Sequence, residues 1–343
     1  MRGKARAVGP WMRFAVLLMV VATAAVVFVD GFDLSGFVAR IVAADPVYVA
    51  VAVVVYAISW IPRGVRYSKI LARTGHVCGT AAMTGAIFVS QTANLVFPAR
   101  AGDGARAYVV KKRNGVPYTA GAASLAAERV LDLVAVLALG VVGFVWTSAV
   151  FGFEPTRGHG AFLAATAAGA VTVVAVVVVY FARGRRFDVG GGADEGVLTR
   201  AADALSGFVD ELGAVFDDRN GVIRLAATSI TIWVLDVATA VVLFYALGAN
   251  FSSVGGVIGV SLLAVSVGNL AKVVPATPGG VGLYEAGFAA VVVGATGVGW
   301  ETAVAVAVLD HAVKNVVTFV GGVASALALN VSLTRPAEEV TDA

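Results

Sequence analysis

Two stretches of the chain resemble one another: Phe97-Pro98-Ala99-Arg100-Ala101-Gly102-Asp103-Gly104 and Val274-Pro275-Ala276-Thr277-Pro278-Gly279-Gly280-Val281. Each follows an apolar run and places Pro, Gly or charge where a membrane-spanning helix would otherwise continue. Irregular backbone at membrane depth is tolerated only where it is buried in protein or lines a water-filled cavity. Paired broken helices of this kind are typical of transporters.

The composition indicates a polytopic membrane protein. The chain is 59% hydrophobic and 14% charged, with a mean hydropathy of +0.88, so most of it requires lipid or membrane-buried protein around it. The net charge of +3 comes from Lys and Arg residues gathered in a few loops, a pattern that reports membrane topology rather than a nucleic-acid surface. We therefore expect no nucleic-acid partner, and the single cysteine excludes an intrachain disulfide.

The apolar pattern predicts eight membrane segments, of which six span the bilayer, at roughly 20 residues per span. The predicted spans are residues 14–29, 47–61, 130–151, 161–181, 223–247 and 301–329, and the two re-entrant segments are 80–97 and 254–274. The segment 80–97 is interpreted as re-entrant because basic stretches flank it on both sides, and both of its ends are therefore expected to be cytoplasmic. The loop before it contains Arg63, Arg66, Lys69 and Arg73, and the stretch after it contains Arg100, Arg106, Lys111, Lys112 and Arg113. Segment 14–29 also resembles a signal peptide, but its apolar run continues past the apparent cleavage site.

The two motifs are separated by an odd number of predicted crossings, which inverts the second copy relative to the first. The sequence therefore predicts an all-α inverted repeat in which the two hairpin tips meet near the membrane midplane. A chance recurrence in a chain rich in Gly and Ala is the alternative. We expect a single membrane domain over 1–335, with a first repeat at about 11–182, a cytoplasmic connector at about 183–222, a second repeat at about 223–330 and a polar tail at 336–343.

The predicted location is the cell membrane, with the N-terminus and C-terminus both cytoplasmic, because the basic flanks fall on that side. Within the connector, apolar residues recur at helical spacing over 201–216. This pattern predicts a helix that lies on the surface with one apolar face.

Two later segments carry charges at matching positions. Glu128, Arg129 and Asp132 follow the first motif, and Asp310, His311 and Lys314 follow the second. Residues four apart share a helix face, and a charge at membrane depth costs a few kcal/mol, so it usually faces a partner or a polar path. Two interpretations stay open, structural ion pairs that hold helices together and a polar path for a lipid headgroup.

His311 and Asp236 each have two interpretations. An imidazole with an ordinary pKa of about 6.5 is able to carry a proton, but His311 also fits a hydrogen-bonded interior histidine. Asp236 follows Trp233 within an apolar helix and fits either a structural ion pair or the polar path.

The second motif has the composition of an anion-binding turn. Thr277, Gly279, Gly280 and Gly282 precede a helix that is expected to start near Leu283, and the free backbone N–H groups of a helix start bind phosphate or carboxylate. The alternative is a tight turn in which the glycines only permit close packing. It is not a nucleotide-binding P-loop, since the Lys-Ser/Thr ending is missing.

Four motifs in order resemble the flippase-like transmembrane family typified by the membrane half of lysylphosphatidylglycerol synthases. They are Arg63-x-x-Arg66-Tyr67, Asn94-x-x-x-Pro98-x-Arg100-x-Gly102-Asp103-x-x-Arg106-x-Tyr108, Glu128-Arg129-x-x-Asp132 and Pro275-x-Thr277-Pro278-Gly279-Gly280-x-Gly282-x-x-Glu285. The resemblance covers about 11–329 and implies movement of a charged or sugar-bearing lipid between leaflets. The chain departs from the family in lacking a soluble aminoacyltransferase or glycosyltransferase domain, and in having His311 where the family more often has Arg.

We therefore expect a lipid translocase that flips a phosphate-containing lipid or lipid-linked sugar, with no enzymatic activity, no cofactor, no metal and no catalytic residue. The alternative is a membrane anchor subunit, or a membrane-embedded part, of a lipid aminoacyltransferase or glycosyltransferase system. Expected partners are a phospholipid or polyprenyl-phosphate-linked substrate and a separately encoded transferase. The expected lipid-binding residues are Arg100, Asp103, Arg106, Glu128, Arg129, Asp132, Thr277, Gly279, Gly280, Gly282, Glu285, Asp310, His311 and Lys314.

Overall fold

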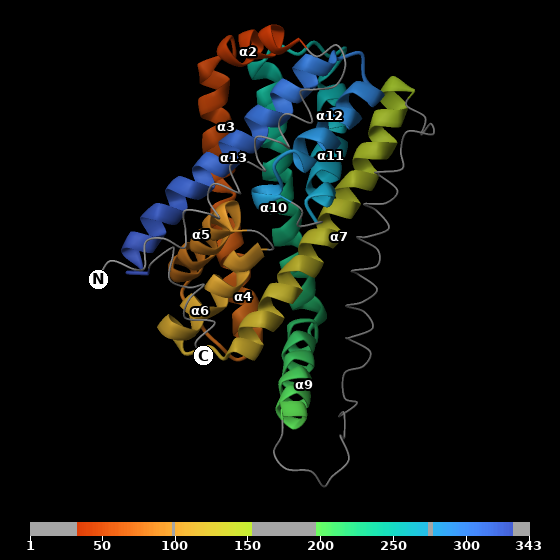
Figure 1. Cartoon of the computed structure of the whole chain (residues 1–343). Coiled ribbons are helices and arrows are strands. Elements are labelled where there is room, and N and C mark those ends of the chain that lie inside the picture. Colours follow the sequence, from red (N-terminus) through yellow and green to blue (C-terminus); the bar gives the residue numbers. More distant parts are fainter. Residues whose placement is uncertain (1–32, 98–99, 153–196, 274–276, 332–343) are drawn as a thin grey trace, which may run out of the picture.

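The described part of the chain is helical, without a β-strand (Figure 1). The computed structural model describes residues 33–97, 100–152, 197–273 and 277–331. Within these residues, six helical segments have the length and hydropathy needed to cross a membrane. The all-α, multi-pass membrane fold predicted from composition is thus confirmed.

Five helices make up the described residues before the long connecting helix. They are α2 (Leu34–Val42), α3 (Pro46–Ile58), α4 (Trp60–Arg73), α5 (Thr80–Val96) and α6 (Ala101–Asn114). Helix α3 starts where Asp45 accepts a hydrogen bond from the Val47 N–H at 2.8 Å and where Pro46 occupies the first turn, a position that needs no N–H donor. Only Ser59 separates α4 from α3, so the two helices together form one apolar segment, Pro46–Arg73.

This segment corrects the sequence-based boundary. The span predicted at 47–61 was expected to end in a basic cytoplasmic loop that contains Arg66, but the helix continues to Arg73 and Arg66 is 0% exposed. The charge is accommodated in the interior because Arg66 forms ion pairs with Glu128 and Asp132.

The remaining elements are α7 (Tyr118–Phe151), α9 (Val197–Val215), α10 (Arg219–Ala246), α11 (Val254–Ala271), the short 3₁₀ turn η3 (Pro278–Gly280), α12 (Leu283–Ala295) and α13 (Trp300–Ala328). Helix α9 confirms the surface helix predicted at 201–216, and α12 starts at the predicted position. The span predicted at 130–151 is only the second part of α7, which begins at Tyr118 and carries the predicted charges well inside the helix.

The predicted and observed sets of spans overlap but differ. Predicted spans 14–29 and 161–181 lie outside the described residues. In their place, α11 and the stretch Pro278–Ala295, which flank the second motif, also meet the length and hydropathy criterion. The two re-entrant hairpins and the count of eight segments therefore stay predictions.

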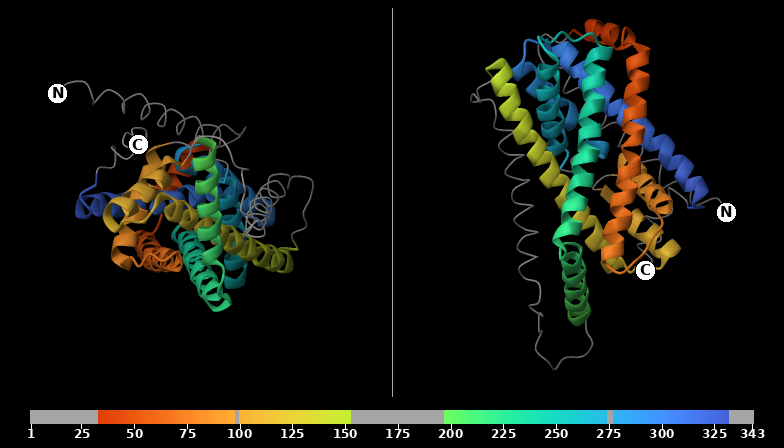
Figure 2. Two further views of the ribbon diagram at one scale, coloured as in Figure 1. Left: turned by 90° about the horizontal axis from the view of Figure 1, so that it is seen from below. Right: turned by 180° about the vertical axis from the view of Figure 1, so that it is seen from behind.

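The helices pair in a crossed pattern. Helix α7 packs along α11, and α13 packs along α5. Helix α10 lies beside α3, as the rear view in Figure 2 shows. Glycines permit these close contacts. A Cβ on Gly143 of α7 would lie 2.5 Å from the backbone nitrogen of Leu263 on α11.

Apolar residues cover the outside as well as filling the core. Val141 and Val145 of α7 and Val316 and Val320 of α13 are all exposed, as expected for helices that face lipid. At one end of the molecule, the apolar face of α9 packs on α4 and α7. A set of charged side chains also lines a cavity inside the bundle.

Candidate functional site

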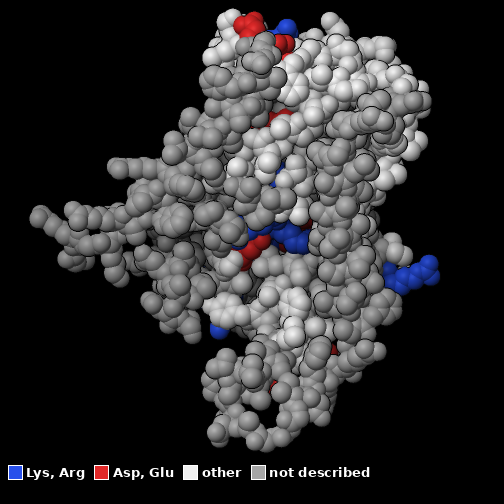
Figure 3. Space-filling view, turned by 45° about the vertical axis from the view of Figure 1, so that its right-hand side comes forward, with Lys and Arg blue, Asp and Glu red and all other residues white. Residues whose placement is uncertain are grey.

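A cavity of about 490 Å³ lies at the centre of the described bundle. Figure 3 shows basic side chains (blue) and acidic side chains (red) together in a hollow at mid-height. The charged residues that line the cavity are Arg63, Arg100, Asp103, Arg129, Asp132, Asp236, Lys272 and Lys314. The lining residues come from α3, α4, α5, α6, α7, α10, α11, α13 and η3 or from the ends of these elements.

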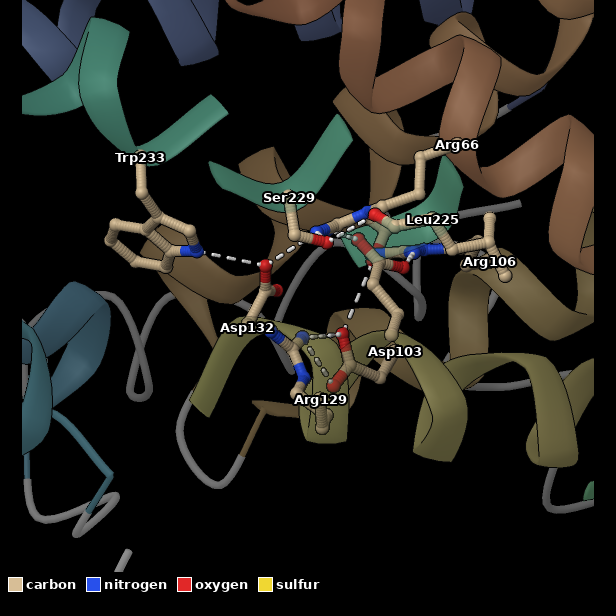
Figure 4. Close-up of polar contacts among 10 residues, drawn as sticks. Arg66, Asp103, Arg106, Arg129, Asp132, Leu225, Ser229 and Trp233 are labelled. Atoms are coloured by element: carbon tan, nitrogen blue, oxygen red, sulfur yellow. Dashed lines mark hydrogen bonds and ion pairs between the residues drawn. The ribbon is translucent and has the colours of Figure 1, made fainter. Parts of the chain in front are cut away.

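On one side lies what we call the first charged cluster, comprising Arg66, Arg100, Asp103, Arg106, Glu128, Arg129 and Asp132. Its buried part is centred on Arg66, whose guanidinium donates to Asp132 at 2.7 Å and to Glu128 at 3.1 Å. Arg106 donates to the other oxygen of Glu128, and Figure 4 shows the side chains of Arg66 and Arg106 close together. Two arginines thus hold one carboxylate, and both are 0% exposed.

Two further groups fix the buried part of this cluster. Ser229 on α10 accepts a hydrogen bond from Arg66 at 2.8 Å, and the Trp233 indole N–H donates to Asp132 at 3.1 Å. Helix α10 is therefore tied to α4 and α7 by polar contacts, and Asp132 is held at the edge of the cavity.

The cavity side of the first charged cluster is an ion pair between Arg129 and Asp103 at 3.1 Å. Asn94 organises it, because its amide donates to Asp103 at 3.1 Å and its carbonyl oxygen accepts from the Gly102 N–H at 2.8 Å. The end of α5 and the start of α6 are thus joined through one side chain.

On the other side lies the second charged cluster, comprising Asp236, Lys272, Glu285, Asp310, His311 and Lys314. Lys314 binds Asp236 and Asp310 at 2.8 Å each. The Tyr284 hydroxyl donates to Asp310 at 2.5 Å. His311 Nδ1 lies 2.6 Å from Glu285, whose other oxygen accepts from the Gly282 N–H at 2.7 Å.

The broken ends of the helices lie between the two clusters. Arg100, at the start of α6, has a left-handed backbone with φ 56° and ψ 36°, a conformation that costs free energy for a residue other than Gly and is found often at functional sites. Its guanidinium donates to the Lys272 carbonyl at 3.4 Å. Gly279 and Gly280 also have positive φ, so this turn requires glycine.

The structure divides the fourteen expected lipid-binding residues into two groups. Those that line the cavity are Arg100, Asp103, Arg129, Asp132, Thr277, Gly279, Gly280, His311 and Lys314. Those behind the lining are Arg106, Glu128, Gly282, Glu285 and Asp310. The second group holds the first in place through the ion pairs and hydrogen bonds described above.

Several lining residues were absent from the expected set: Tyr56, Trp60, Arg63, Trp233, Lys272 and Asn315. Arg63 had been assigned to a loop. The three-residue spacing between Arg63 and Arg66 puts both on one helix face, and this signal was present in the sequence. No short-range pattern singles out Asn315 or Tyr56.

The described residues contain no group of three or more His, Cys, Asp or Glu side chains arranged to hold a metal ion. The carboxylates of both clusters face cations or an imidazole instead. Such an arrangement is suited to binding and orienting a charged ligand.

Fold and site together define a multi-pass α-helical membrane protein with a charged internal cavity. The chain matches the family model described as the lysylphosphatidylglycerol synthase TM region over residues 11–322, and it belongs to that family. The resemblance recognised from the four sequence motifs is confirmed.

Two curated relatives match most of the chain. A protein of Haloferax volcanii named glycosyltransferase AglD is 46% identical over 319 residues, which cover 86% of this chain and 51% of the relative. A protein of Methanothermobacter thermautotrophicus named UPF0104 membrane protein is 26% identical over 321 residues, which cover 87% of this chain and 89% of the relative. The chain thus spans about half the length of the first relative.

The first relative corrects one expectation. The sequence was interpreted as that of a protein without enzymatic activity, but a relative with 46% identity over most of the chain is named as a glycosyltransferase. The expectation of no enzymatic activity is therefore wrong as a conclusion from the sequence pattern alone.

Proposed function

We propose that the chain is the membrane-embedded part of a glycosyltransferase system, and that its cavity holds the phosphate and sugar of a lipid-linked substrate while the lipid tail stays in the bilayer. The name of the Haloferax relative supports the reaction class. The charged cavity, enclosed by helices with apolar outer faces, supports a ligand with a charged head and an apolar tail.

One observation carries this proposal: some of the cationic side chains that line the cavity have no carboxylate partner. All six carboxylates of the two charged clusters contact a cationic side chain or an imidazole. Among the described residues, Arg63, Arg100 and Lys272 line the cavity without a carboxylate partner. Unpaired charges away from bulk water are costly, and an anionic ligand would relieve that cost.

The surroundings of these cations also favour an anion. Lys272 Nζ lies 4.5 Å from the centre of the Tyr284 ring, and Arg63 lies over the rings of Tyr56 and Trp60. Such cation–π contacts stabilise a charge without neutralising it. The positive charge thus stays available to a phosphate.

The glycine turn supplies further donors. The Thr277 hydroxyl is buried without a hydrogen-bond partner in the described structure, and it lines the same cavity as Gly279 and Gly280. A Cβ on Gly280 would lie 2.3 Å from Cγ of Lys272, so glycine is needed for the turn to lie against this lysine. We propose that Arg100, Lys272 and Thr277 together contact the phosphate.

The proposal assigns Arg106 a different task from the one expected. Arg106 is one of the expected lipid-binding residues, but its side chain is 0% exposed and bound to Glu128. We propose instead that Arg106 and Arg66 hold Glu128, and thereby position α7 against the cavity.

We also propose the inverted repeat, with two re-entrant hairpins formed by α5–α6 and α11–α12. The crossed packing supports it, because α7 packs on α11 just as α13 packs on α5, the exchange that a two-fold axis in the membrane plane would produce. The assignment of one membrane domain with cytoplasmic termini in the cell membrane belongs to the same proposal. Exposed Lys111 and Lys112 near the end of α6 support a cytoplasmic position for that end.

Lipid translocation is the second candidate function. Broken helices that enclose charged side chains near mid-height favour it, because such sites in transporters are reached from either side in turn. The two candidates differ in outcome: glycosyl transfer changes the lipid chemically, whereas translocation changes only its leaflet.

The test uses the purified chain in lipid nanodiscs and a short-chain isoprenyl phosphoryl hexose as the probe. We expect Arg100→Asn and Lys272→Gln to weaken binding by about tenfold or more each, since a hydrogen bond to a charged group contributes about 1.5–3 kcal/mol. Asn is chosen at position 100 because it tolerates a left-handed backbone. Arg224→Gln, on the exposed part of α10, is the matched control.

Unchanged affinity in both cavity variants would remove these residues from the site. To separate the two functions, proteoliposomes that contain the chain receive the probe with a radiolabelled hexose and a lipid-linked acceptor. Labelled acceptor supports glycosyl transfer. Probe that changes leaflet without chemical change supports translocation instead.

A further inference from the structure

The two charged clusters contain the same carboxylate–base pair at the same helical positions. Asp103 is the third residue of α6 and Glu285 the third residue of α12. Arg129 is the twelfth residue of α7 and His311 the twelfth residue of α13. Each pair is separated by 26 residues in sequence, and each is in direct contact, at 3.1 Å in the first cluster and 2.6 Å in the second.

The equivalent bases differ in one chemical property. The guanidinium of Arg129 stays protonated at any pH that a folded protein survives. An imidazole, unlike a guanidinium, is able to exist with or without its second proton at physiological pH. The first pair is thus permanently neutralised, and the second is neutralised only when a proton is bound.

The charge balance of each cluster makes this difference matter. The first charged cluster has four guanidinium groups and three carboxylates. The second has two ammonium groups, those of Lys272 and Lys314, and three carboxylates, those of Asp236, Glu285 and Asp310. Arg63 lines the cavity beside this cluster and brings the count to three cations against three carboxylates, so a proton on His311 adds one net positive charge.

The neighbours of His311 leave Glu285 as its carboxylate partner. On its own helix, Asp310 is occupied by Lys314 and by the Tyr284 hydroxyl, and Lys314 also binds Asp236 of α10. From α12, the Tyr284 ring lies 4.8 Å from the imidazole, and Lys272 at the end of α11 lies over that same ring.

The other helices that pack on α13 bring no further charge to this position. Helices α3 and α5 contain no Asp, Glu, Lys, Arg or His. Helix α2 has only Arg40, which is exposed. Arg63 of α4 lines the cavity with His311 and carries a fixed positive charge.

We infer that the Glu285–His311 pair is a proton-binding site that sets the charge of the second charged cluster and thereby the strength of anion binding in the cavity. With the proton bound, the second charged cluster together with Arg63 carries one net positive charge, which favours a phosphate beside Lys272. Without the proton, the charges of this group are balanced and the phosphate is attracted less strongly. Anion binding should therefore strengthen as pH falls through the titration of this pair. The inference rests on the proposed function only for the identity of the anion.

The first experiment observes the proton directly and needs no ligand. The chain contains three histidines, so His76→Gln with His159→Gln leaves His311 alone. Its imidazole nitrogens, labelled with ¹⁵N, are followed by NMR in nanodiscs from pH 5 to 9. We expect conversion from imidazolium to neutral imidazole in this range, and a titration that moves in Glu285→Gln. An imidazole that keeps one protonation state from pH 5 to 9 would overturn the inference.

The second experiment measures the coupling to the anion. The probe is the short-chain isoprenyl phosphoryl hexose, a phosphodiester that keeps one negative charge across this range. Wild-type affinity should fall by about tenfold between the low- and high-pH limits, the effect of one charge at about 12 Å with an effective dielectric constant of about 20. His311→Arg should remove this pH dependence and keep tight binding at high pH.

Arg129→His is the matched variant, since it places a titratable base at the equivalent position of the first charged cluster. It should add a second pH-dependent step. Equal pH profiles for wild type and His311→Arg would overturn the coupling. If the probe fails to bind at any pH while His311 still titrates, the proposed function fails and the proton site stands.

Discussion

Arg100 and Lys272 meet although 172 residues separate them: the guanidinium of Arg100 donates to the backbone carbonyl of Lys272 at 3.4 Å. Each residue lies beside one of the two interrupted helix ends. A carbonyl at a helix end needs a donor, and here the donor comes from the other half of the chain. The contact joins the two interruptions at the wall of a single cavity.

This contact predicts a crosslink between the two helix ends. Leu95 lies against Gly279, where an added Cβ would be 3.2 Å from the Leu95 side chain. Leu95→Cys with Gly279→Cys, in a Cys78→Ser background, should therefore form a disulfide or crosslink with a short reagent. Leu95→Cys with Gly294→Cys is the control, since a Cβ on Gly294 meets nothing within 4 Å. Equal yields for both pairs would contradict the contact.

Replacing each of two glycines in α6 by alanine should change the stability of the protein in opposite directions. A Cβ on Gly102 would lie 2.1 Å from the Ser90 carbonyl oxygen, whereas a Cβ on Gly104 meets nothing within 4 Å. Gly102→Ala should destabilise the protein by about 1–3 kcal/mol, as overpacking does. Gly104→Ala should be neutral or stabilising, because Ala favours helix by about 1 kcal/mol. Thermal unfolding in detergent measures both changes in stability. A Gly102→Ala protein as stable as the wild type would contradict the close crossing of α5 and α6.

Glu128 should be a structural requirement. It accepts from both Arg66 and Arg106, so Glu128→Gln leaves these buried cations without full compensation and should cost about 3–5 kcal/mol of folding free energy. Steric trapping in bicelles measures this loss. Asp210→Asn, at an exposed position of α9, is the control. A loss of less than 1 kcal/mol in Glu128→Gln would show that water, and not protein, solvates the two arginines.

Acid should loosen the start of α10. Hydrogen bonds from the backbone N–H groups of Gly221 and Asn220 lower the pKa of Asp218, which caps this helix. A lowered folded-state pKa gives stabilisation that is present above the ordinary value near 3.8 and is lost as pH falls through the folded value. Hydrogen exchange of the first turn should therefore accelerate below about pH 4.

Asp218→Asn separates charge from geometry in this cap. The amide oxygen still accepts from the backbone but does not titrate, so the acid-induced step should disappear while the helix start stays protected at neutral pH. Asp218→Ala should expose the first turn at every pH. An acid step that persists in Asp218→Asn would assign the effect to another group.

Helix identity and charge spacing were predictable because both follow from local pattern. The apolar runs predicted α5, α10, α11 and α13 to within a few residues, and the sequence showed that Glu128, Arg129 and Asp132 have the same spacing as Asp310, His311 and Lys314. A predicted helix boundary was wrong where a charged side chain is stabilised by an ion pair inside the protein and not by water. Arg66 looked like a loop residue because its partners, Glu128 and Asp132, are more than 60 residues away.

The role of each charge was harder to predict than its position. Arg100 and Arg106 have the same charge and nearly the same place in the sequence, but Arg106 is bound to Glu128 and Arg100 lines the cavity. Which arginine finds a carboxylate depends on the packing of α6 against α7, and spacing within one helix does not encode that choice. Asn315 and Tyr56 also line the cavity from two different helices, and spacing within one helix does not predict that they share a cavity.

Helix α7 is one uninterrupted rod of 34 residues, about 50 Å long at 1.5 Å per residue, against a hydrocarbon core of about 30 Å. Its first part packs on α9, its middle carries Glu128, Arg129 and Asp132, and its last part contacts α11 through Gly143. No described hinge separates these parts. A displacement of α9 would therefore move the carboxylates at the cavity and the α11 contact together, because one continuous helix carries all three.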